Sequence, residues 1–515
     1  MRNLILFISL FLVVFSNAQL TPQQANREMV RGINLGNTLE PPTEGAWNNS
    51  PVRQYYFDDY KEAGFSSVRI PVRWDNYTQK IAPYTVNNEW MNRIEQVVDW
   101  ALERDLYVVI NTHHDDWIKS GYEQKEQRDR FDSIWSQISV RFQDKPEKLL
   151  FEMINEPHGI SLANINELNA RVLSIIRKTN PTRIVLFSGH MWSNSAELIA
   201  AAIPDDPYIM GYFHSYDPYL FGLKGQGTWG TQTDINSMKS KFKSVKDWSE
   251  ENNVPVTINE FGAINTGEYN SRMYHYASYV EEALRSNFSF NAWDDGGDFR
   301  IYQRATRGWN DIKNILIYTN IFTPTKLNVA IVRDSVLQIK WENRHETADS
   351  IFIERRTENS QFQKIASLEH TASVFEDYNI TIGNHYYYRV VLHYADTTDF
   401  PSYPQRGLLL PYERSPFHGE TYKIPAVIQA EDYDIGGEGL TYHDKTANNR
   451  GGAYRTNEGV DISARADGGY HISHVEEGEW MEYSLTLPQD DINDDVHYYK
   501  RERRKIHRKT ICQVK

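Results

Sequence analysis

The chain has 515 residues, more than one hydrophobic core normally serves, so we expect two to four domains. Its formal net charge of −14 argues against nucleic acid as a partner, because a phosphate backbone attracts a basic surface. Aromatic residues make up 13% of the chain, and its 32 Tyr and 13 Trp present an apolar face with a polar tip, which suits stacking on a ligand as well as packing in a core.

The first 18 residues have the pattern of a signal peptide. Arg2 supplies a positive charge, residues 4–15 are continuously apolar, and small residues precede the expected cleavage after Ala18. The apolar stretch is short for a membrane span, and no later stretch is long enough for one. We therefore expect a protein that is secreted or held in the periplasm or at the cell surface, with no membrane attachment after cleavage. The single cysteine, Cys512, excludes a disulfide within the chain.

Short apolar runs alternate with longer amphipathic stretches between residues 19 and 322. In residues 88–105, for example, Trp90, Ile94 and Val98 recur at helical spacing and share one face. Eight repeats of strand and helix over about 300 residues predict an α/β fold, a (β/α)8 TIM barrel. The eight expected strands lie within residues 30–37, 65–74, 106–115, 149–157, 183–192, 208–216, 254–262 and 288–297.

Residues 326–412 change to short alternating strands without a helical period, which predicts a β-sandwich. The placing of Trp341 and of the tyrosines at 386–388 resembles a fibronectin type III domain.

The next region, residues 420–489, resembles the first half of a carbohydrate-binding module of family 6, a jelly-roll domain. The motifs are IPAVIQAEDYD (424–434) and EGEWMEYSLTLP (477–488), and the resemblance stops near Pro488. It implies a structural calcium ligand at Glu431, and positions near a sugar cleft at Glu479 and Trp480. Residues 490–515 form a basic tail, and the break in the pattern indicates a truncation or a frame disruption.

Polar and aromatic residues gather where the expected barrel strands end, and this is where TIM barrels carry their chemistry. Two carboxylates belong to the set, one from the fourth strand and one from the seventh. The candidate site residues are Arg69, His113, His114, Asn155, Glu156, His214, Tyr216, Glu260 and Trp293.

Several motifs of the barrel resemble glycoside hydrolase family 5, the cellulase-like family of clan A. They include GINLGNTLE (32–40), FEMINEPHG (151–159), INEFG (258–262) and AWDDGGDF (292–299). The resemblance covers residues 30–300 and implies an endo-β-1,4-glucanase that hydrolyses a β-glucan with retention of configuration.

The resemblance also implies a role for each candidate. Glu156 would be the acid/base, with a pKa raised by burial and by the second glutamate, and Glu260 the nucleophile. Hydrogen bonds from Arg69 and Tyr216 suit an ionised Glu260. Asn155 would donate to the sugar 2-OH, His214 would contact Glu156, His113 and His114 would line the −1 subsite, and Trp293 would form its floor.

Other interpretations of single residues stay open. The pair His113 and His114 could ligate a metal, but no third ligand at helical spacing supports a site, so we expect no metal in the barrel and no cofactor for catalysis. Glu152 is expected to hydrogen-bond inside the barrel, and Asp115 and Asp116 are expected in a loop. Stacking on outer sugars and ordinary packing are equally open for Trp47, Trp117, Trp192 and Trp229.

Alternative functions stay open as well. A xyloglucanase, a mixed-linkage β-glucanase or a β-mannanase would use the same frame, because loops decide among these glycans. An inactive glycan-binding protein and a protein-interaction scaffold built on the sandwich are the non-enzyme alternatives. We expect a monomer whose partner is a β-glucan polysaccharide.

Overall fold

The computed structural model describes residues 19–486, apart from positions 334–335, 345–347, 359, 382, 396–398, 409–413, 439 and 447. The expected signal peptide and the basic tail, with Cys512, lie outside the described residues. The chain divides into two compact units: residues up to Val329 with 339–375 and 386–406, and residues 330–338, 376–385 and 407 onward. Within the described part of the chain, no helix combines the length and the apolar character needed to cross a membrane.

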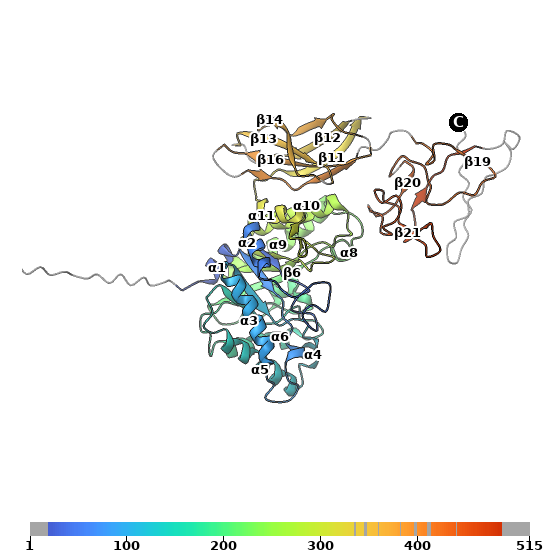
Figure 1. Cartoon of the computed structure of the whole chain (residues 1–515). Helices are drawn as coiled ribbons and strands as arrows, with labels where there is room; N and C mark the ends of the chain where they lie inside the picture. The colour runs from blue at the N-terminus through green and yellow to red at the C-terminus, as the bar shows by residue number, and fades with distance from the viewer. Residues whose placement is uncertain are drawn as a thin grey trace, which may run out of the picture. The chain divides into compact units, whose positions relative to one another are not determined.

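Eight parallel strands close into a barrel in the order β1 to β8, so the predicted (β/α)8 fold is confirmed (Figure 1). The ring closes where Ile33 of the first strand pairs with Val68 on one side and with Ala292 on the other. The strands are β1 (Arg31–Asn34), β2 (Ser67–Ile70), β3 (Tyr107–Asn111), β4 (Leu149–Glu152), β5 (Val185–Phe187), β6 (Ile209–Ser215), β7 (Val256–Phe261) and β8 (Ser289–Ala292).

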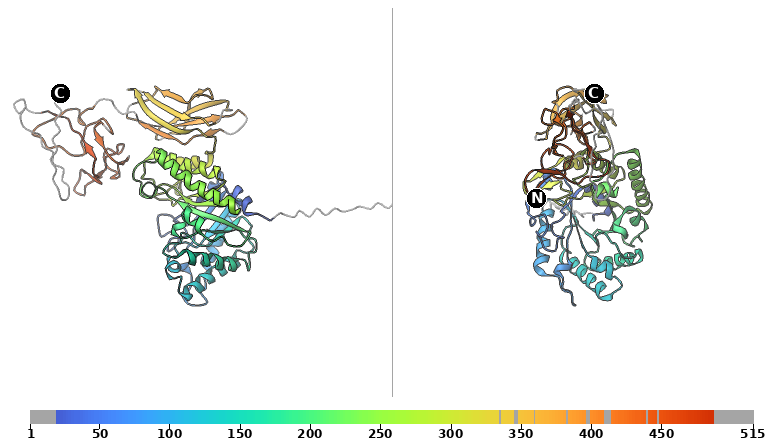
Figure 2. Two further views of the ribbon diagram at one scale, coloured as in Figure 1. Left: turned by 180° about the vertical axis from the view of Figure 1, so that it is seen from behind. Right: turned by 90° about the vertical axis from the view of Figure 1, so that its right-hand side faces the viewer.

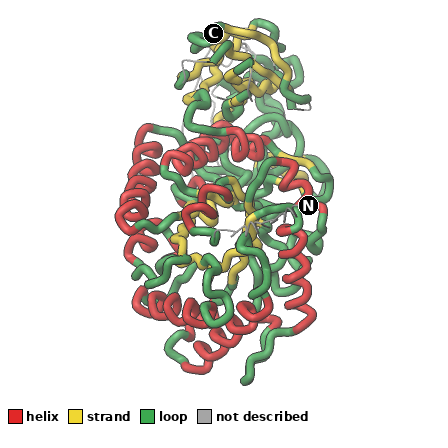
Figure 3. The backbone as a smooth tube through the Cα atoms, turned by 90° about the vertical axis from the view of Figure 1, so that its left-hand side faces the viewer, coloured by secondary structure: helices red, strands yellow, loops and turns green. Residues whose placement is uncertain are grey.

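Helices form an outer ring around these strands (Figure 3). Their starts follow capping rules: the Asn87 side chain accepts from the Trp90 N–H, and Thr231 and Asp234 form a capping box. The helices are α1 (Pro22–Glu28), α2 (Tyr55–Ala63), α3 (Asn88–Leu102), α4 (Asp116–Gly121), α5 (Lys125–Arg141), α6 (Leu162–Ile176), α7 (Ser195–Ala200), α8 (Tyr219–Gly222), α9 (Gln232–Asn252), α10 (Tyr269–Arg285) and α11 (Asp311–Tyr318), with 3-10 turns η1 (Asp75–Tyr77) and η2 (Met191–Ser193).

Residues 325–408, here called the β-rich region, form two sheets. One has the order β11-β12-β15, and the other has the order β14-β13-β16-β17 with β18 paired to β16. Leu337, Ile339 and Trp341 alternate inward along β12, as the sequence pattern predicts. The strands are β11 (Thr325–Arg333), β12 (Val336–Glu342), β13 (Ser350–Arg356), β14 (Gln363–Leu368), β15 (Val374–Asp377), β16 (His385–His393), β17 (Phe400–Pro401) and β18 (Gln405–Leu408).

Residues 415–486, the C-terminal region, form three two-stranded sheets (Figure 2). Tyr433, Tyr442, Val460 and Ile462 make a small buried core among them. The pairs are β19 (Tyr422–Lys423) with β24 (Leu485–Thr486), β20 (Tyr442–His443) with β23 (Trp480–Met481), and β21 (Ile462–Ala464) with β22 (Tyr470–Ile472). One further short pair, β9 (Tyr302–Gln303) with β10 (Gly308–Trp309), belongs to the barrel domain.

Candidate active site

Two glutamates face each other across the carboxyl end of the barrel. Glu260 lies inside β7 and is 4% exposed, whereas Glu156 follows β4 in a loop. One oxygen of each carboxyl group and one ring nitrogen of His214 all lie within 4.8 Å of one another. The strands thus bring together the two carboxyls that the sequence singled out.

Arg69 of β2 holds Glu260 in place through a hydrogen bond. The guanidinium is fully buried and donates from Nη1 to Glu260 Oε1 at 2.6 Å. It also makes a bidentate pair with Glu152, through Nε at 2.6 Å and Nη2 at 2.7 Å, and Nη2 reaches Asn155 Oδ1 at 2.7 Å. Charge-assisted bonds of this kind hold planar groups in one orientation, and the positive charge of Arg69 favours the ionised form of Glu260.

Glu152 lies in the barrel interior, as expected, and binds the same guanidinium that holds Glu260. Its carboxylate accepts from Asn111 Nδ2 at 3.0 Å and from Asn259 Nδ2 at 2.6 Å as well as from Arg69. A buried charge is costly unless its lone pairs are satisfied, and this set satisfies them. Sequence reasoning missed Asn111, Asn259 and Asn34, which accepts from Arg69 at 2.9 Å. These three residues could have been found in the sequence as polar residues at or near the ends of buried strands.

An irregular step in β7 brings two consecutive residues into the interior. Phe213 of β6 pairs with Ile258 of β7, but the next residue of β6, His214, pairs with Glu260, so the register shifts by one residue. A second shift lies between Ile258 and Phe261 where β7 pairs with β8. Successive residues of a regular strand point to opposite faces, and a bulge can redirect a side chain. Asn259 therefore reaches Glu152 while Glu260 reaches Arg69.

Tyr216 and His214 complete the surroundings of the two carboxyls. The Tyr216 hydroxyl donates to Glu260 Oε2 at 2.8 Å. His214 Nδ1 lies 3.0 Å from Glu156 Oε1 and 3.6 Å from Glu260 Oε2. The ring therefore stands between the two carboxyls, as well as contacting Glu156 as expected.

The two carboxyls titrate as a pair because both face this ring. Burial raises the pKa of Glu260, and the positive charges of His214 and Arg69 offset part of the rise. Burial also acts to raise the pKa of Glu156, but the hydrogen bond and charge of His214 outweigh it and lower that pKa. The expected rise at Glu156 is therefore wrong for the substrate-free site, because the hydrogen bond and charge of His214 favour the ionised carboxylate.

Aromatic rings line the space beside the carboxyls. The rings of His113 and Trp293 are nearly parallel, with centroids 6.3 Å apart, and His114 meets His113 edge-on at 4.5 Å. Burial lowers the pKa of both histidines, that of His114 to about 4, so both rings are neutral walls near neutral pH. Asn155 uses its oxygen toward Arg69, which leaves its amide nitrogen as a donor for a ligand.

The same three groups, Glu156, His214 and Glu260, are close enough together to ligate a metal ion. Both oxygens of Glu260 already accept hydrogen bonds, and the guanidinium of Arg69 lies 2.6 Å from one of them. A second cation beside Arg69 is electrostatically unfavourable. The donor set therefore suits acid–base chemistry better than metal binding, and a metal-free site stays a prediction.

The loop tryptophans separate into two classes. Trp117 packs on Phe131 under Arg130, and Trp229 is 5% exposed against Tyr274 and His275, so both belong to ordinary packing. Trp47 and Trp192 are 41% and 52% exposed and stay candidates for stacking on outer sugars.

The two loop aspartates also differ from each other. Asp115 is buried and accepts from the Trp117 indole N–H at 2.9 Å, and burial raises its pKa to about 6. Asp116 begins α4, and its side chain is largely exposed.

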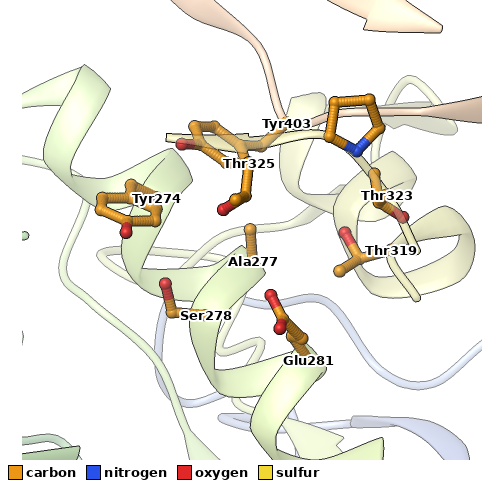
Figure 4. Close-up of a pocket in the computed structure, with 9 residues that line it drawn as sticks. Tyr274, Ala277, Ser278, Glu281, Thr319, Thr323, Thr325 and Tyr403 are labelled. Atoms are coloured by element: carbon orange, nitrogen blue, oxygen red, sulfur yellow. The ribbon is translucent and has the colours of Figure 1, made fainter. Parts of the chain in front are cut away.

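A small pocket elsewhere in the first unit contains none of the site residues (Figure 4). It is lined by one side of α10, including Tyr274 and Glu281, by Thr319 and residues 323–325, and by Tyr403. It holds no facing pair of carboxyls, so the catalytic geometry lies at the strand ends and not here.

The model of the family described as cellulase, glycosyl hydrolase family 5, matches residues 24–296. Endoglucanase H of Acetivibrio thermocellus is 48% identical over 303 residues, which are 57% of this chain and 33% of that relative. The chain thus spans about a third of the length of this curated relative.

Solved structures agree with this match. Cel5A of Thermotoga maritima, determined with a mannotriose substrate, is 32% identical with a TM-score of 0.55, over 57% of this chain and 100% of that one. A tri-modular family 5, subfamily 4 endo-β-1,4-glucanase from Bacillus licheniformis is 30% identical with a TM-score of 0.66, over 78% of this chain and 81% of that one. The second match is too long for the barrel alone, so it includes part of the regions that follow.

Proposed function

This chain belongs to the cellulase family, glycosyl hydrolase family 5, and from that premise we propose that it is a secreted endo-β-1,4-glucanase acting with retention of configuration. The observation that carries the proposal is the pair Glu156 and Glu260, with oxygens within 4.8 Å of each other. Retaining glycosidases hold their two carboxyls about 5–5.5 Å apart, whereas inverting enzymes leave about 6.5–9.5 Å for a water molecule.

The first step would form a glycosyl ester on Glu260. The carboxylate oxygen attacks the anomeric carbon, and the bond to the leaving oxygen breaks. Glu156, in its protonated form, gives that oxygen a proton. A sugar in the cleft removes water from Glu156, which favours its uncharged form and so its role as an acid.

The second step would release the sugar. Glu156, now ionised, takes a proton from a water molecule as the water attacks the anomeric carbon, and Glu260 leaves as a carboxylate. Arg69 and Tyr216 stabilise the charge that returns to Glu260. Two displacements at one carbon restore its original configuration.

The retaining outcome is the direct test. Proton NMR of the first products from a cello-oligosaccharide should show the β-anomer before mutarotation, because each displacement inverts the anomeric carbon once. A substrate of known anomeric purity without enzyme serves as the control for mutarotation. An initial excess of the α-anomer would contradict the proposal.

The pH dependence gives a second test, through Tyr216. Glu260 must be ionised to attack, and burial raises its pKa, so kcat/KM should fall as the pH drops through that raised value. The hydrogen bond from Tyr216 acts to lower the same pKa. Tyr216→Phe removes it, so the acid limb of the kcat/KM profile should move to higher pH.

Tyr318→Phe on α11 is the matched control, because it makes the same change in a helix outside the site. An acid limb that stays in place, or moves to lower pH, in Tyr216→Phe would contradict the assigned role of Tyr216.

Related glycans are the alternative substrates. The Thermotoga maritima relative was determined with mannotriose, which keeps β-mannan beside xyloglucan and mixed-linkage β-glucan as candidates for this chain. Turnover of carboxymethylcellulose, xyloglucan, lichenan and mannan, with product sizing, ranks them. No turnover of any of the four would favour the alternative of an inactive glycan-binding protein.

The proposal extends to the other regions. The alternating strands of the β-rich region support a fibronectin type III-like sandwich, and the short strand pairs of the C-terminal region support half of a family 6 jelly roll. Glu431 would be a calcium ligand there. The pattern of residues 1–18 supports export, and we propose that the protein acts as a monomer.

A further inference from the structure

His158 lies two residues after the proposed acid/base and has no role in the steps above. Three contacts converge on its ring. Nδ1 lies 2.9 Å from the main-chain oxygen of Glu156, and Nε2 lies 3.3 Å from Asp116 Oδ1. The ring also stacks on Trp192, with centroids 5.3 Å apart and planes 9° apart. A carbonyl oxygen only accepts, so Nδ1 is the donor in the contact with Glu156.

The main chain at Glu156 needs such support. Glu156 has φ +42°, in the left-handed region that residues with a Cβ seldom occupy. His158 donates to the carbonyl of Glu156, and the Trp192 N–H donates to the carbonyl of Pro157 at 2.9 Å. Two consecutive carbonyl groups are therefore held, which fixes the direction of the Glu156 side chain.

The same ring sets the position of Trp192. Trp192 has φ +58° within the short turn η2, and 52% of the residue is exposed. His158 covers one face of the indole, so the other face is left for a ligand. The main-chain N–H of Trp192 donates to Pro157, the residue after Glu156, so the turn that carries the indole is attached to the loop of the proposed acid/base.

We propose that His158 is a positioning residue for the leaving-group half of the reaction, holding both the main chain of Glu156 and the Trp192 ring on which the departing sugar stacks. Asp116, which also lies 3.4 Å from Lys119 Nζ, holds His158 from the β3–α4 side. This inference rests on the proposed glucanase function.

The test compares two substrates. The leaving group of a cello-oligosaccharide is a sugar that must be protonated as it departs. The leaving group of dinitrophenyl cellobioside is not a sugar and departs without a proton. His158→Ala should lower kcat/KM on the oligosaccharide by about tenfold to a hundredfold, because small misplacements of a reacting group have effects of this size. The kcat/KM for the dinitrophenyl substrate, which reports only the first step, should change by less than about threefold.

Two conservative variants separate the contacts. His158→Asn keeps a donor near the Glu156 carbonyl without a ring, so it should restore kcat but not KM on the oligosaccharide. His158→Phe keeps a ring against Trp192 without a donor, so it should restore KM but not kcat. They also keep the test open if His158→Ala fails to fold.

His393→Ala in the β-rich region is the matched control, because His393 likewise pairs with an aspartate, Asp399, and stacks on an aromatic ring, Phe352. Equal losses on both substrates, or no loss on the oligosaccharide, would overturn the inference while wild-type turnover stands. A wild-type protein inactive on both substrates would instead overturn the proposed function.

Discussion

Glu260→Gln is expected to remove turnover of glucans and of activated aryl glycosides alike, by about 10⁴-fold or more. The amide keeps the shape of the side chain but cannot form the glycosyl ester, and every substrate passes through that ester. The Arg69 guanidinium, 2.6 Å from the Glu260 oxygen, would also face an uncharged partner. Initial rates on a cello-oligosaccharide and on dinitrophenyl cellobioside measure the loss.

Glu282→Gln on α10 is the control, because Glu282 is another glutamate whose pKa is raised by burial and it lies outside the site. Thermal unfolding of both variants separates chemistry from folding. Substantial turnover by Glu260→Gln on either substrate would remove Glu260 from its role.

Glu156→Ala should give a different pattern. Loss of the acid should slow glucan cleavage by about 10²–10⁴-fold, the usual contribution of general acid–base catalysis. Dinitrophenyl cellobioside needs no proton on its leaving group, so its first step should survive and the glycosyl-enzyme should accumulate as a burst. Added azide should then restore turnover and give the β-glycosyl azide, because azide attacks without needing a general base.

Glu260→Ala with azide is the paired experiment. Azide would occupy the place of the lost nucleophile and give the α-glycosyl azide in one displacement. The two azide products therefore distinguish the two glutamates by stereochemistry. If both variants fail equally on the dinitrophenyl substrate, or give the same azide anomer, the assignment of roles is wrong.

The eight strands of the barrel were predictable because buried parallel strands read as short apolar runs between amphipathic helices. The residues at which these strands end were less predictable. The fourth strand was expected to end in Asn155 and Glu156, but β4 ends at Glu152 and both residues lie beyond it. The left-handed backbone at Glu156 cannot continue a strand, and nothing in its residue type announces that conformation.

The candidate site residues could be found from their types at strand ends, but their partners could not. Asn259 and Glu260 are neighbours in the chain, so a regular strand would turn one of them away from the barrel. The register shifts in β7 overrule that expectation. The position of His214 between both carboxyls, which changes the expected pKa order, likewise depends on geometry that sequence spacing does not encode.

The shared guanidinium has a consequence for electroneutrality. Arg69 is one positive charge held by two carboxylates, Glu152 and Glu260, all three buried, so together they carry a surplus of one negative charge. A sugar approaching the oxocarbenium state carries one positive charge, and the ester that follows cancels the charge of Glu260. Because Glu152 also pairs with Arg69, the positive charge that develops on the sugar is attracted to Glu260, and the ester that follows leaves Arg69 paired with Glu152.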